Sequence, residues 1–444
     1  MYDMTLLLLY FLLFTLLSID IYKKTKKGWT AEAFFLSLLM FFYVFVPITM
    51  IIHSNISSEN YNVPDLLSPN NIQIYSYLSF LVELIFISFF YLGLKVASHK
   101  SIIIKSIKKR TVRVGNYKIS VLVTIGYFLV LLSFFSMLIY VKQFGGFEKT
   151  IMTATTVRSG YLTSVVENTQ LIFVKRFVYF AIFGLIVYIA MDKKKTLLDV
   201  LILLILSLAT LIISRLFLFA GKEAVLGIFL MLLFYFSIKK QKPFYSYIVY
   251  FLLFLFFLLP TMDYLSDALR YEDSADMSFV SNGLMSFLGY FSFTQVSLEF
   301  AIYREYEYLF FQDFIFGLRG FILPSSWLQN WDISTIEINT FFFNGKYEST
   351  VPPGIIAFGY YSFGLFGVML VAFLSGYIIK KIDLLFSSLV HANVHYAIFY
   401  AYILSALYAA VRTGVPKFVF YNTTNITFLI FIAFSYSFIL KQKR

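Results

Sequence analysis

The chain has 444 residues, of which 60% are hydrophobic and 14% are charged, and its formal net charge at pH 7 is +12. A soluble domain carries about 25% charged residues, so this composition excludes an ordinary water-soluble protein. The apolar runs do not alternate with polar residues, which excludes a β-barrel. The sequence has no cysteine, so disulfides and thiolate chemistry are excluded too. These features predict an all-α, polytopic integral membrane protein.

Apolar stretches of about twenty residues predict about eleven membrane-spanning helices. The first has no basic segment before it and is followed by four lysines within 23–27, which is typical of an uncleaved anchor. Eight spans are expected within 1–262 and three within 355–444, in one integrated membrane domain. In chain order the predicted spans are 4–22, 31–53, 72–94, 119–141, 171–191, 197–214, 217–238, 244–262, 355–379, 394–412 and 418–440.

Basic residues concentrate in every second connection between these spans. Because basic connections remain in the cytoplasm, the N-terminus is predicted to lie outside and the C-terminus inside. The connections assigned to the cytoplasm hold 23 of the 36 Lys and Arg residues. They are 23–27, 95–118, 192–195, 239–242, 380–383 and 441–444.

The apolar stretch 197–238 has basic segments on both sides, so it must cross the membrane an even number of times. It is interrupted at Ser214-Arg215 and at Gly221-Lys222-Glu223. The pattern predicts a tight helical hairpin with Arg215 and Lys222 near its outer tip.

The connection 263–354 is by far the longest, with 92 positions, and is predicted to lie on the outer face. Its apolar patches 287–293 and 308–316 are typical of amphipathic helices that rest on the bilayer surface. Long loops in compact proteins are usually functional, so the active or binding surface is expected here.

Several cations lie outside the cytoplasmic connections, at the ends of spans or in outer loops. At such depth a cation is unfavourable unless it extends to the headgroups, pairs, or meets an anionic ligand. Contact with headgroups is the plain explanation for each residue taken singly. A phosphate-binding cluster is the alternative, because the planar guanidinium bonds phosphate oxygens in pairs. The candidate diphosphate-binding residues are Arg158, Arg176, Arg215, Lys222, Arg270, Arg319 and Arg412.

Two acids and two tryptophans of the long connection are further candidates. Glu272 and Asp273 follow Arg270 and could orient a sugar hydroxyl or act as a general base, although a solvated loop is the plain alternative. Trp327 and Trp331 could stack on sugar rings or simply anchor the chain at the interface.

Other ionisable residues carry less information. Glu83 lies within a predicted span, where pairing with a Lys or Tyr of the bundle is favoured over proton transfer. His391 and His395 are four positions apart but have no third ligand nearby, so no metal site is predicted.

Three stretches resemble the Wzy-type polysaccharide polymerases, also called O-antigen or oligosaccharide repeat-unit polymerases. They are GGFEK at 145–149 leading to VRSG at 157–160, the stretch 339–376, and Arg412-Thr413-Gly414. With the topology, the likeness covers most of the chain. Family members carry Gly-Ser/Thr-Arg where this chain has Gly221-Lys222, with Arg215 about two turns earlier. Either cation could take the family's role, and Arg215 is favoured because Lys lacks bidentate geometry.

The resemblance implies an all-helical architecture like that of the C-type glycosyltransferases, with one large outer loop. It also implies a metal-independent enzyme without cofactors that joins undecaprenyl-diphosphate-linked oligosaccharide repeat units into O-antigen, capsular or related polysaccharide. The site would face outward from the bacterial plasma membrane, with a chain-length regulator and a flippase as partners besides the bilayer, and no nucleic acid. The alternatives are a glycan ligase, a lipid-linked oligosaccharide flippase or other transporter, and a scaffold for assembly proteins.

Overall fold

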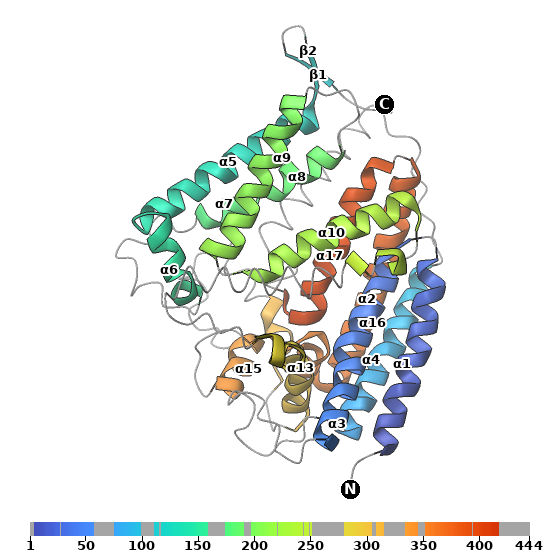
Figure 1. Cartoon of the computed structure of the whole chain (residues 1–444). Helices are drawn as coiled ribbons and strands as arrows, with labels where there is room; N and C mark the ends of the chain where they lie inside the picture. Colours follow the sequence, from blue (N-terminus) through green and yellow to red (C-terminus); the bar gives the residue numbers. More distant parts are fainter. Residues whose placement is uncertain are drawn as a thin grey trace.

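The computed structural model of the chain is mainly helical, with one two-stranded hairpin (Figure 1). It describes residues 4–26, 28–56, 75–98, 111–114, 117–158, 174–190, 197–219, 221–242, 244–247, 249–250, 279–303, 308–314, 334–344, 351–392 and 394–416.

The regular helices and the strands are α1 (Met4–Thr25), α2 (Ala31–Met40), α3 (Val46–Ile56), α4 (Tyr77–Ala97), β1 (Thr111–Val114), β2 (Tyr117–Ser120), α5 (Val121–Gln143), α6 (Phe147–Arg158), α7 (Lys175–Val178), α8 (Ala181–Ala190), α9 (Leu197–Ile212), α10 (Lys222–Lys240), α13 (Phe279–Tyr303), α15 (Thr335–Asn344), α16 (Ile355–Ala392) and α17 (Ala397–Thr413). Two π-helical turns, η1 (Phe41–Phe45) and η5 (Ile213–Leu218), join α2 to α3 and continue α9. Short 3₁₀ turns are η6 (Phe244–Tyr247) and η9 (Val394–Tyr396).

Within the described residues, five helices are long and apolar enough to cross a bilayer, and two more are apolar but shorter. Each of the seven overlaps a predicted span, so the chain is a multi-pass membrane protein. The predicted span 418–440 and most of 244–262 lie outside the described residues. The five long helices are Met4–Thr25, Ala31–Ile52, Tyr77–Ala97, Gly126–Gln143 and Ile355–His391, and the shorter two are Ile202–Leu218 and Ala397–Thr413.

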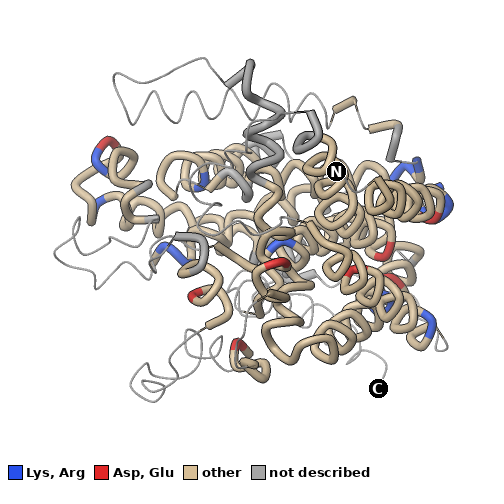
Figure 2. The backbone as a smooth tube through the Cα atoms, turned by 90° about the horizontal axis from the view of Figure 1, so that it is seen from below, with Lys and Arg blue, Asp and Glu red and all other residues tan. Residues whose placement is uncertain are grey.

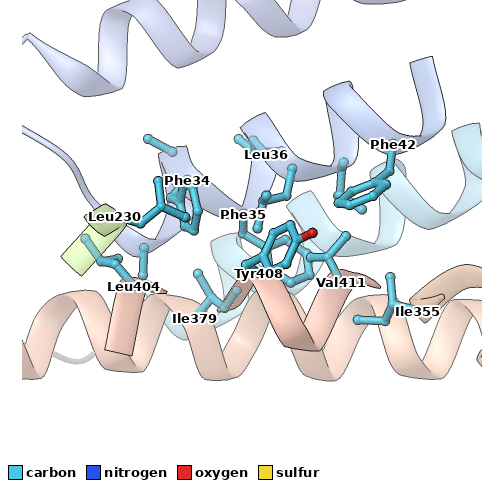
Figure 3. Close-up of a cluster of buried hydrophobic side chains, with 14 of the residues drawn as sticks. Phe34, Phe35, Leu36, Phe42, Leu230, Ile355, Ile379, Leu404, Tyr408 and Val411 are labelled. Carbon is cyan, nitrogen blue, oxygen red and sulfur yellow. The ribbon is translucent and has the colours of Figure 1, made fainter. Parts of the chain in front are cut away.

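The helices pack through large apolar side chains. In Figure 3 Phe34 and Phe35 of α2 face Tyr408 and Val411 of α17, all buried. Because lipid is as apolar as these side chains, close packing rather than transfer from water holds such helices together.

Two glycines allow the closest crossing in the bundle. Gly93 of α4 and Gly376 of α16 lie so near each other's helix that a Cβ on either would collide with a backbone carbonyl, of Phe373 or of Phe90. α4 and α16 therefore cross backbone to backbone, as small residues permit in membrane proteins.

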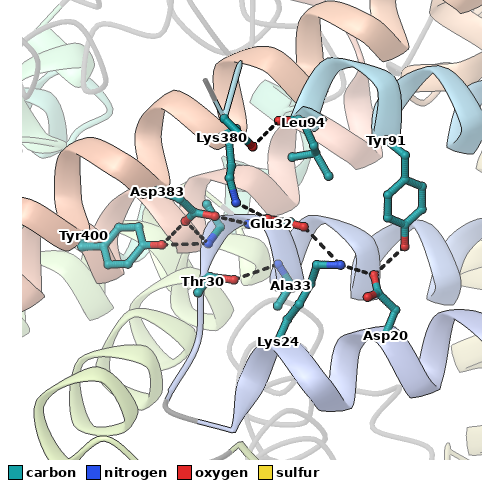
Figure 4. A network of polar contacts seen from close by, with 12 residues as sticks. Asp20, Lys24, Thr30, Glu32, Ala33, Tyr91, Leu94, Lys380, Asp383 and Tyr400 are labelled. Atoms are coloured by element: carbon teal, nitrogen blue, oxygen red, sulfur yellow. Dashed lines mark hydrogen bonds and ion pairs between the residues drawn. The ribbon is translucent and has the colours of Figure 1, made fainter. Parts of the chain in front are cut away.

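A polar network joins five helices at the predicted cytoplasmic end (Figure 4). Glu32 forms ion pairs with Lys24, at 3.1 Å, and with Lys380, at 3.0 Å. Asp383 accepts hydrogen bonds from the first backbone N–H groups of α2, at 2.6 and 3.0 Å, and from the Tyr400 hydroxyl. These contacts satisfy the free donors of the α2 N-terminus with a negative charge, which also suits its dipole.

Lys24 also pairs with Asp20, which accepts a hydrogen bond of 2.6 Å from the Tyr91 hydroxyl of α4. We call the set Asp20, Lys24, Glu32, Tyr91, Lys380, Asp383 and Tyr400 the cytoplasmic network.

α16 is not one straight helix, in contrast to the single span predicted at 355–379. Phe363 and Gly364 leave the helical conformation, and Gly364 has a φ of +57°, which favours glycine. The backbone of Gly359 lies against that of Gly367 and Val368, so the short arm 355–362 doubles back on the helix after the break. Hydropathy misses this break because apolar residues flank it on both sides.

The segment 308–314 closes the end of this short arm. The backbone N–H groups of Leu309 and Phe310 donate to the carbonyls of Tyr361 and Ser362, at 3.0 and 2.8 Å. They satisfy carbonyls that the break leaves without helical donors.

α13 also differs from its prediction as part of a surface-bound loop. Its described side chains between 291 and 301 are buried or half-buried, and the helix packs on α3, α4 and α16. The polar residues of this segment suggest a solvent-exposed helix face. The four polar side chains in question are nevertheless buried: Thr294, Gln295, Ser297 and Glu299. Neither patch is confirmed as a bilayer-surface helix.

Candidate functional site

The predicted site residues fall into three groups. Glu272, Asp273, Arg270, Arg319, Trp327 and Trp331 lie outside the described residues. Arg158 ends α6 and Lys222 begins α10, and only their backbone is described. Arg176, Arg215 and Arg412 are described with their side chains.

Arg215 lies in the π-helical turn η5, between α9 and α10. The tight hairpin predicted here is not formed, because α9 packs on α5 and α8 whereas α10 packs on α17. The wider turn is closed by hydrogen bonds from Phe219 N–H to the Ser214 carbonyl, at 2.8 Å, and from Gly221 N–H to the Arg215 carbonyl, at 2.5 Å. Such π-bulges occur often at functional sites, because they shift the direction of one side chain.

The Arg215 guanidinium stacks on an aromatic ring. Its Cζ lies 3.5 Å from the centre of the Tyr179 ring, and Tyr402 of α17 is near enough to interact with its charge. The described side chains form no ion pair with it. Among the described residues, aromatic ring faces and not a carboxylate hold the guanidinium in place. Its positive charge therefore remains available to an anionic ligand.

A second cation stands beside this one. The Lys175 Nζ of α7 lies 4.5 Å from the centre of the Phe219 ring and 6.0 Å from that of Tyr140. Arg176 is its neighbour in α7 and is exposed. We call Tyr140, Lys175, Tyr179, Arg215 and Phe219 the Arg215 cluster.

Arg412 lies in the last turn of α17 and is only 8% exposed. Its Cζ is 5.1 Å from the centre of the Phe293 ring of α13 and 5.9 Å from that of Tyr408. A cation held over rings in a dry site interacts more strongly with them than one in water.

The start of α16 lies beside this end of α17. α17 ends at Gly414, which lies against Gly354, the residue before the short arm of α16. Gly354 also touches Thr294, the neighbour of Phe293. The N-terminal end of α16 carries a partial positive charge and the C-terminal end of α17 a partial negative one, so Arg412 supplies the net positive charge that favours an anion here. We call Phe293, Gly354, Tyr408, Arg412 and Gly414 the Arg412 cradle.

The Arg215 cluster and the Arg412 cradle are separate positions along α17. Tyr402, beside Arg215, and Arg412 are ten positions apart in this helix, which corresponds to about 15 Å. The structure therefore does not gather the described cations into one site, and in Figure 2 the Lys and Arg positions are spread over separate parts of the molecule.

Sequence reasoning missed the aromatic partners of these cations and a buried carboxylate elsewhere in the fold. Tyr179, Phe293 and Tyr408 had no signal, because aromatic residues make up 21% of the chain. Asp313 accepts hydrogen bonds from the Thr335 backbone N–H, at 3.1 Å, and from its hydroxyl, at the start of α15. Burial raises the pKa of Asp313, and these hydrogen bonds oppose the rise.

The described residues contain no group of three His, Cys, Asp or Glu side chains that could hold a metal ion. Comparison of the chain with protein-family models, with curated proteins and with solved structures finds no match.

Proposed function

We propose that this protein is a glycosyltransferase that joins undecaprenyl-diphosphate-linked oligosaccharide repeat units into a surface polysaccharide at the outer face of the bacterial plasma membrane. The observation that carries the proposal is the Arg412 cradle, where a buried guanidinium lies two residues before Gly414, which touches Gly354 at the start of α16. The guanidinium favours an anion such as a lipid diphosphate.

The chemistry requires such a group. The bond between the sugar's anomeric carbon and the diphosphate breaks, the acceptor hydroxyl forms the new bond, and its proton passes to a base. Negative charge develops on the departing diphosphate, and a pre-placed guanidinium stabilises it without reorganisation. Glu272 and Asp273 remain the proposed bases, on the grounds of their residue type and neighbourhood in the sequence.

The reaction joins a donor to an acceptor, so both must be bound at the same time. Because each carries a lipid diphosphate, two diphosphates must be held. The Arg215 cluster and the Arg412 cradle supply two cationic positions along one helix. We assign the donor's diphosphate to Arg412, at the predicted outer end of α17, and the acceptor's to Arg215, which lies beside Tyr402 about 15 Å deeper along that helix.

A flippase for lipid-linked oligosaccharide is the second candidate. The broken helix α16 favours it, since transporters often place a helix break at their substrate site. Two carboxyl groups buried in the bundle, Glu83 and Glu299, favour it as well.

The test replaces Arg412 in cells that depend on this protein for surface glycan. Arg412→Ala should abolish long polymer in gel ladders while single repeat units still reach the surface, and Arg412→Lys should retain part of the activity. Lys240→Ala, a cation change at the far end of α10, is the matched control and should give normal ladders. Normal ladders from Arg412→Ala would sink the proposal, whereas loss of all surface glycan, single units included, would favour the flippase.

A further inference from the structure

A second buried polar site lies where α1, α4 and α13 meet, apart from the two cationic positions. It consists of Tyr10 of α1, Ser79 and Glu83 of α4, and Gln295 and Glu299 of α13. All five residues are 0% exposed. We call this set the carboxyl pocket.

The helical spacing of these residues brings them to one place. On α4, Ser76, Ser79 and Glu83 share a face, and on α13 Gln295 and Glu299 are one turn apart. The Ser76 hydroxyl donates to Glu299, at 3.0 Å, and the Gln295 amide donates to the Ser79 hydroxyl, at 3.5 Å. The two faces therefore oppose each other, and the two carboxyl groups are near enough to interact.

Several oxygen atoms of the pocket have no hydrogen-bond partner among the described residues. They are both carboxyl oxygens of Glu83, Oε1 of Glu299, Oε1 of Gln295 and the hydroxyl of Tyr10. The Tyr10 hydroxyl and the Gln295 amide are the donors that approach the Glu83 carboxyl, but neither reaches the geometry of a full hydrogen bond. Buried polar atoms in folded proteins are nearly always satisfied, so a group of unsatisfied oxygens points to a missing positive partner.

The described part of the chain does not supply that partner. None of its Lys, Arg or His side chains forms an ion pair with Glu83 or Glu299. Two buried carboxylates close together are strongly unfavourable unless a bound cation or a proton compensates their charge.

We propose that the carboxyl pocket binds a small hard cation of the Na⁺ class. Its ligands are the carboxylates of Glu83 and Glu299, the amide oxygen of Gln295 and the Tyr10 hydroxyl. A set of oxygen atoms without imidazole or thiolate suits a hard cation rather than a transition metal.

The position of the pocket along the bundle has a mechanical consequence. Glu83 is six positions from the start of α4, about 9 Å along the helix, so the pocket is near the predicted outer end of the bundle. Gln295 is two positions from Phe293, on which Arg412 lies. A cation that joins α4 to α13 therefore also steadies one wall of the Arg412 cradle.

Direct binding of ²²Na⁺ to the purified full-length protein in detergent tests the proposal, with choline chloride keeping the ionic strength constant. The wild type should bind Na⁺ saturably, with about one ion per chain. Glu83→Gln and Glu299→Gln should each weaken binding by about tenfold or more, and Tyr10→Phe by a few fold, as expected for loss of a charged and a neutral ligand. Glu148→Gln, which removes an exposed carboxylate of α6, is the control and should bind as the wild type does.

A thermal measurement gives a second readout. Na⁺ at about ten times its Kd should raise the unfolding temperature of the wild type by roughly 2–4 °C and leave that of Glu83→Gln unchanged. Size-exclusion profiles identify any variant that fails to fold, and Glu83→Asp, which keeps the charge, then serves in its place with weakened binding expected.

Absence of saturable ²²Na⁺ binding in the wild type, or equal binding in both Gln variants, overturns the proposal. Stabilisation by acid alone, with no response to Na⁺, also overturns it and assigns a proton to the pocket. Neither measurement uses a glycan substrate. Failure of the cation proposal is therefore distinguishable from failure of the proposed enzyme activity.

Discussion

Buried carboxylates have partners in one region of the protein and lack them in another, among the described residues. In the cytoplasmic network, Glu32 lies between two lysines, and Asp383 takes backbone and hydroxyl donors of the chain itself. In the carboxyl pocket, Glu83 has no hydrogen-bond partner among the described residues.

This difference gives a criterion that distinguishes structural from functional charges in a membrane protein. Where the chain supplies every counter-charge, removing one partner leaves the other unpaired, and the fold suffers. Where the chain supplies none, the counter-charge comes from outside, and removing the carboxylate changes binding instead. Three substitutions test this distinction and a fourth tests the break in α16; they follow in order of decreasing expected loss of stability.

Asp383→Asn should have the largest effect. It removes the negative charge from the N-terminus of α2 and weakens the buried hydrogen bonds that Asp383 accepts, so we expect a loss of about 2–3 kcal/mol in the free energy of unfolding. The yield of monodisperse protein and its unfolding temperature in detergent measure this. Wild-type values for both would show that the cytoplasmic network is not structural.

Lys380→Met should cost less, about 1–2 kcal/mol, because Glu32 keeps its second partner, Lys24. A double-mutant cycle with Glu32→Gln isolates the pair's own interaction. Additive effects of the two substitutions would mean that Glu32 and Lys380 do not stabilise each other.

Gly364→Ala should destabilise the protein by about 1 kcal/mol, since alanine is strained at a positive φ. The effect should fall on the break between the short arm and the rest of α16, far from the cytoplasmic network. Gly227→Ala, in a helical position of α10 where a Cβ meets nothing within 4 Å, is the control and should not destabilise. Equal destabilisation by both would remove the argument for a strained break.

Glu83→Gln should have the smallest effect on stability in a buffer without Na⁺, between zero and a gain of about 1 kcal/mol, because it removes an uncompensated buried charge. The unfolding temperature in choline chloride measures it. A loss as large as that of Asp383→Asn would mean that the chain itself compensates Glu83, and the contrast between the two regions would be wrong.

Much of the helical frame could be predicted, and the reason is physical. The runs that form α1, α2 and α4 are continuous, apolar and flanked by basic residues, so hydropathy and charge locate them without knowledge of their neighbours. α13 could not be predicted in this way, because its buried Gln295 and Glu299 have the hydropathy of a wet surface. The break at Gly364 leaves no mark on hydropathy either.

The candidate site was predictable only in part. Arg215 and Arg412 stood out by their depth, which is a property of one residue. Their ring partners, and the meeting of Glu83 with Glu299, depend on contacts between helices far apart in the sequence. Glu83 was expected to pair with a Lys or Tyr, and the structure gives it Tyr10 as a neighbour together with an acid that the sequence placed in the outer loop.

The glycine crossing of α4 and α16 limits how these regions can move. Gly93 and Gly376 lie where a Cβ would meet the opposite backbone, so a shift that replaced either glycine at the crossing by a larger residue would cause a collision. The motion that avoids such a collision is a tilt of one helix against the other about the crossing point. Glu83 lies on the predicted outer side of the crossing and Asp383 on the cytoplasmic side, where the cytoplasmic network links the two helices. Any separation of α4 from α16 at their outer ends is therefore limited by how far the cytoplasmic network can deform.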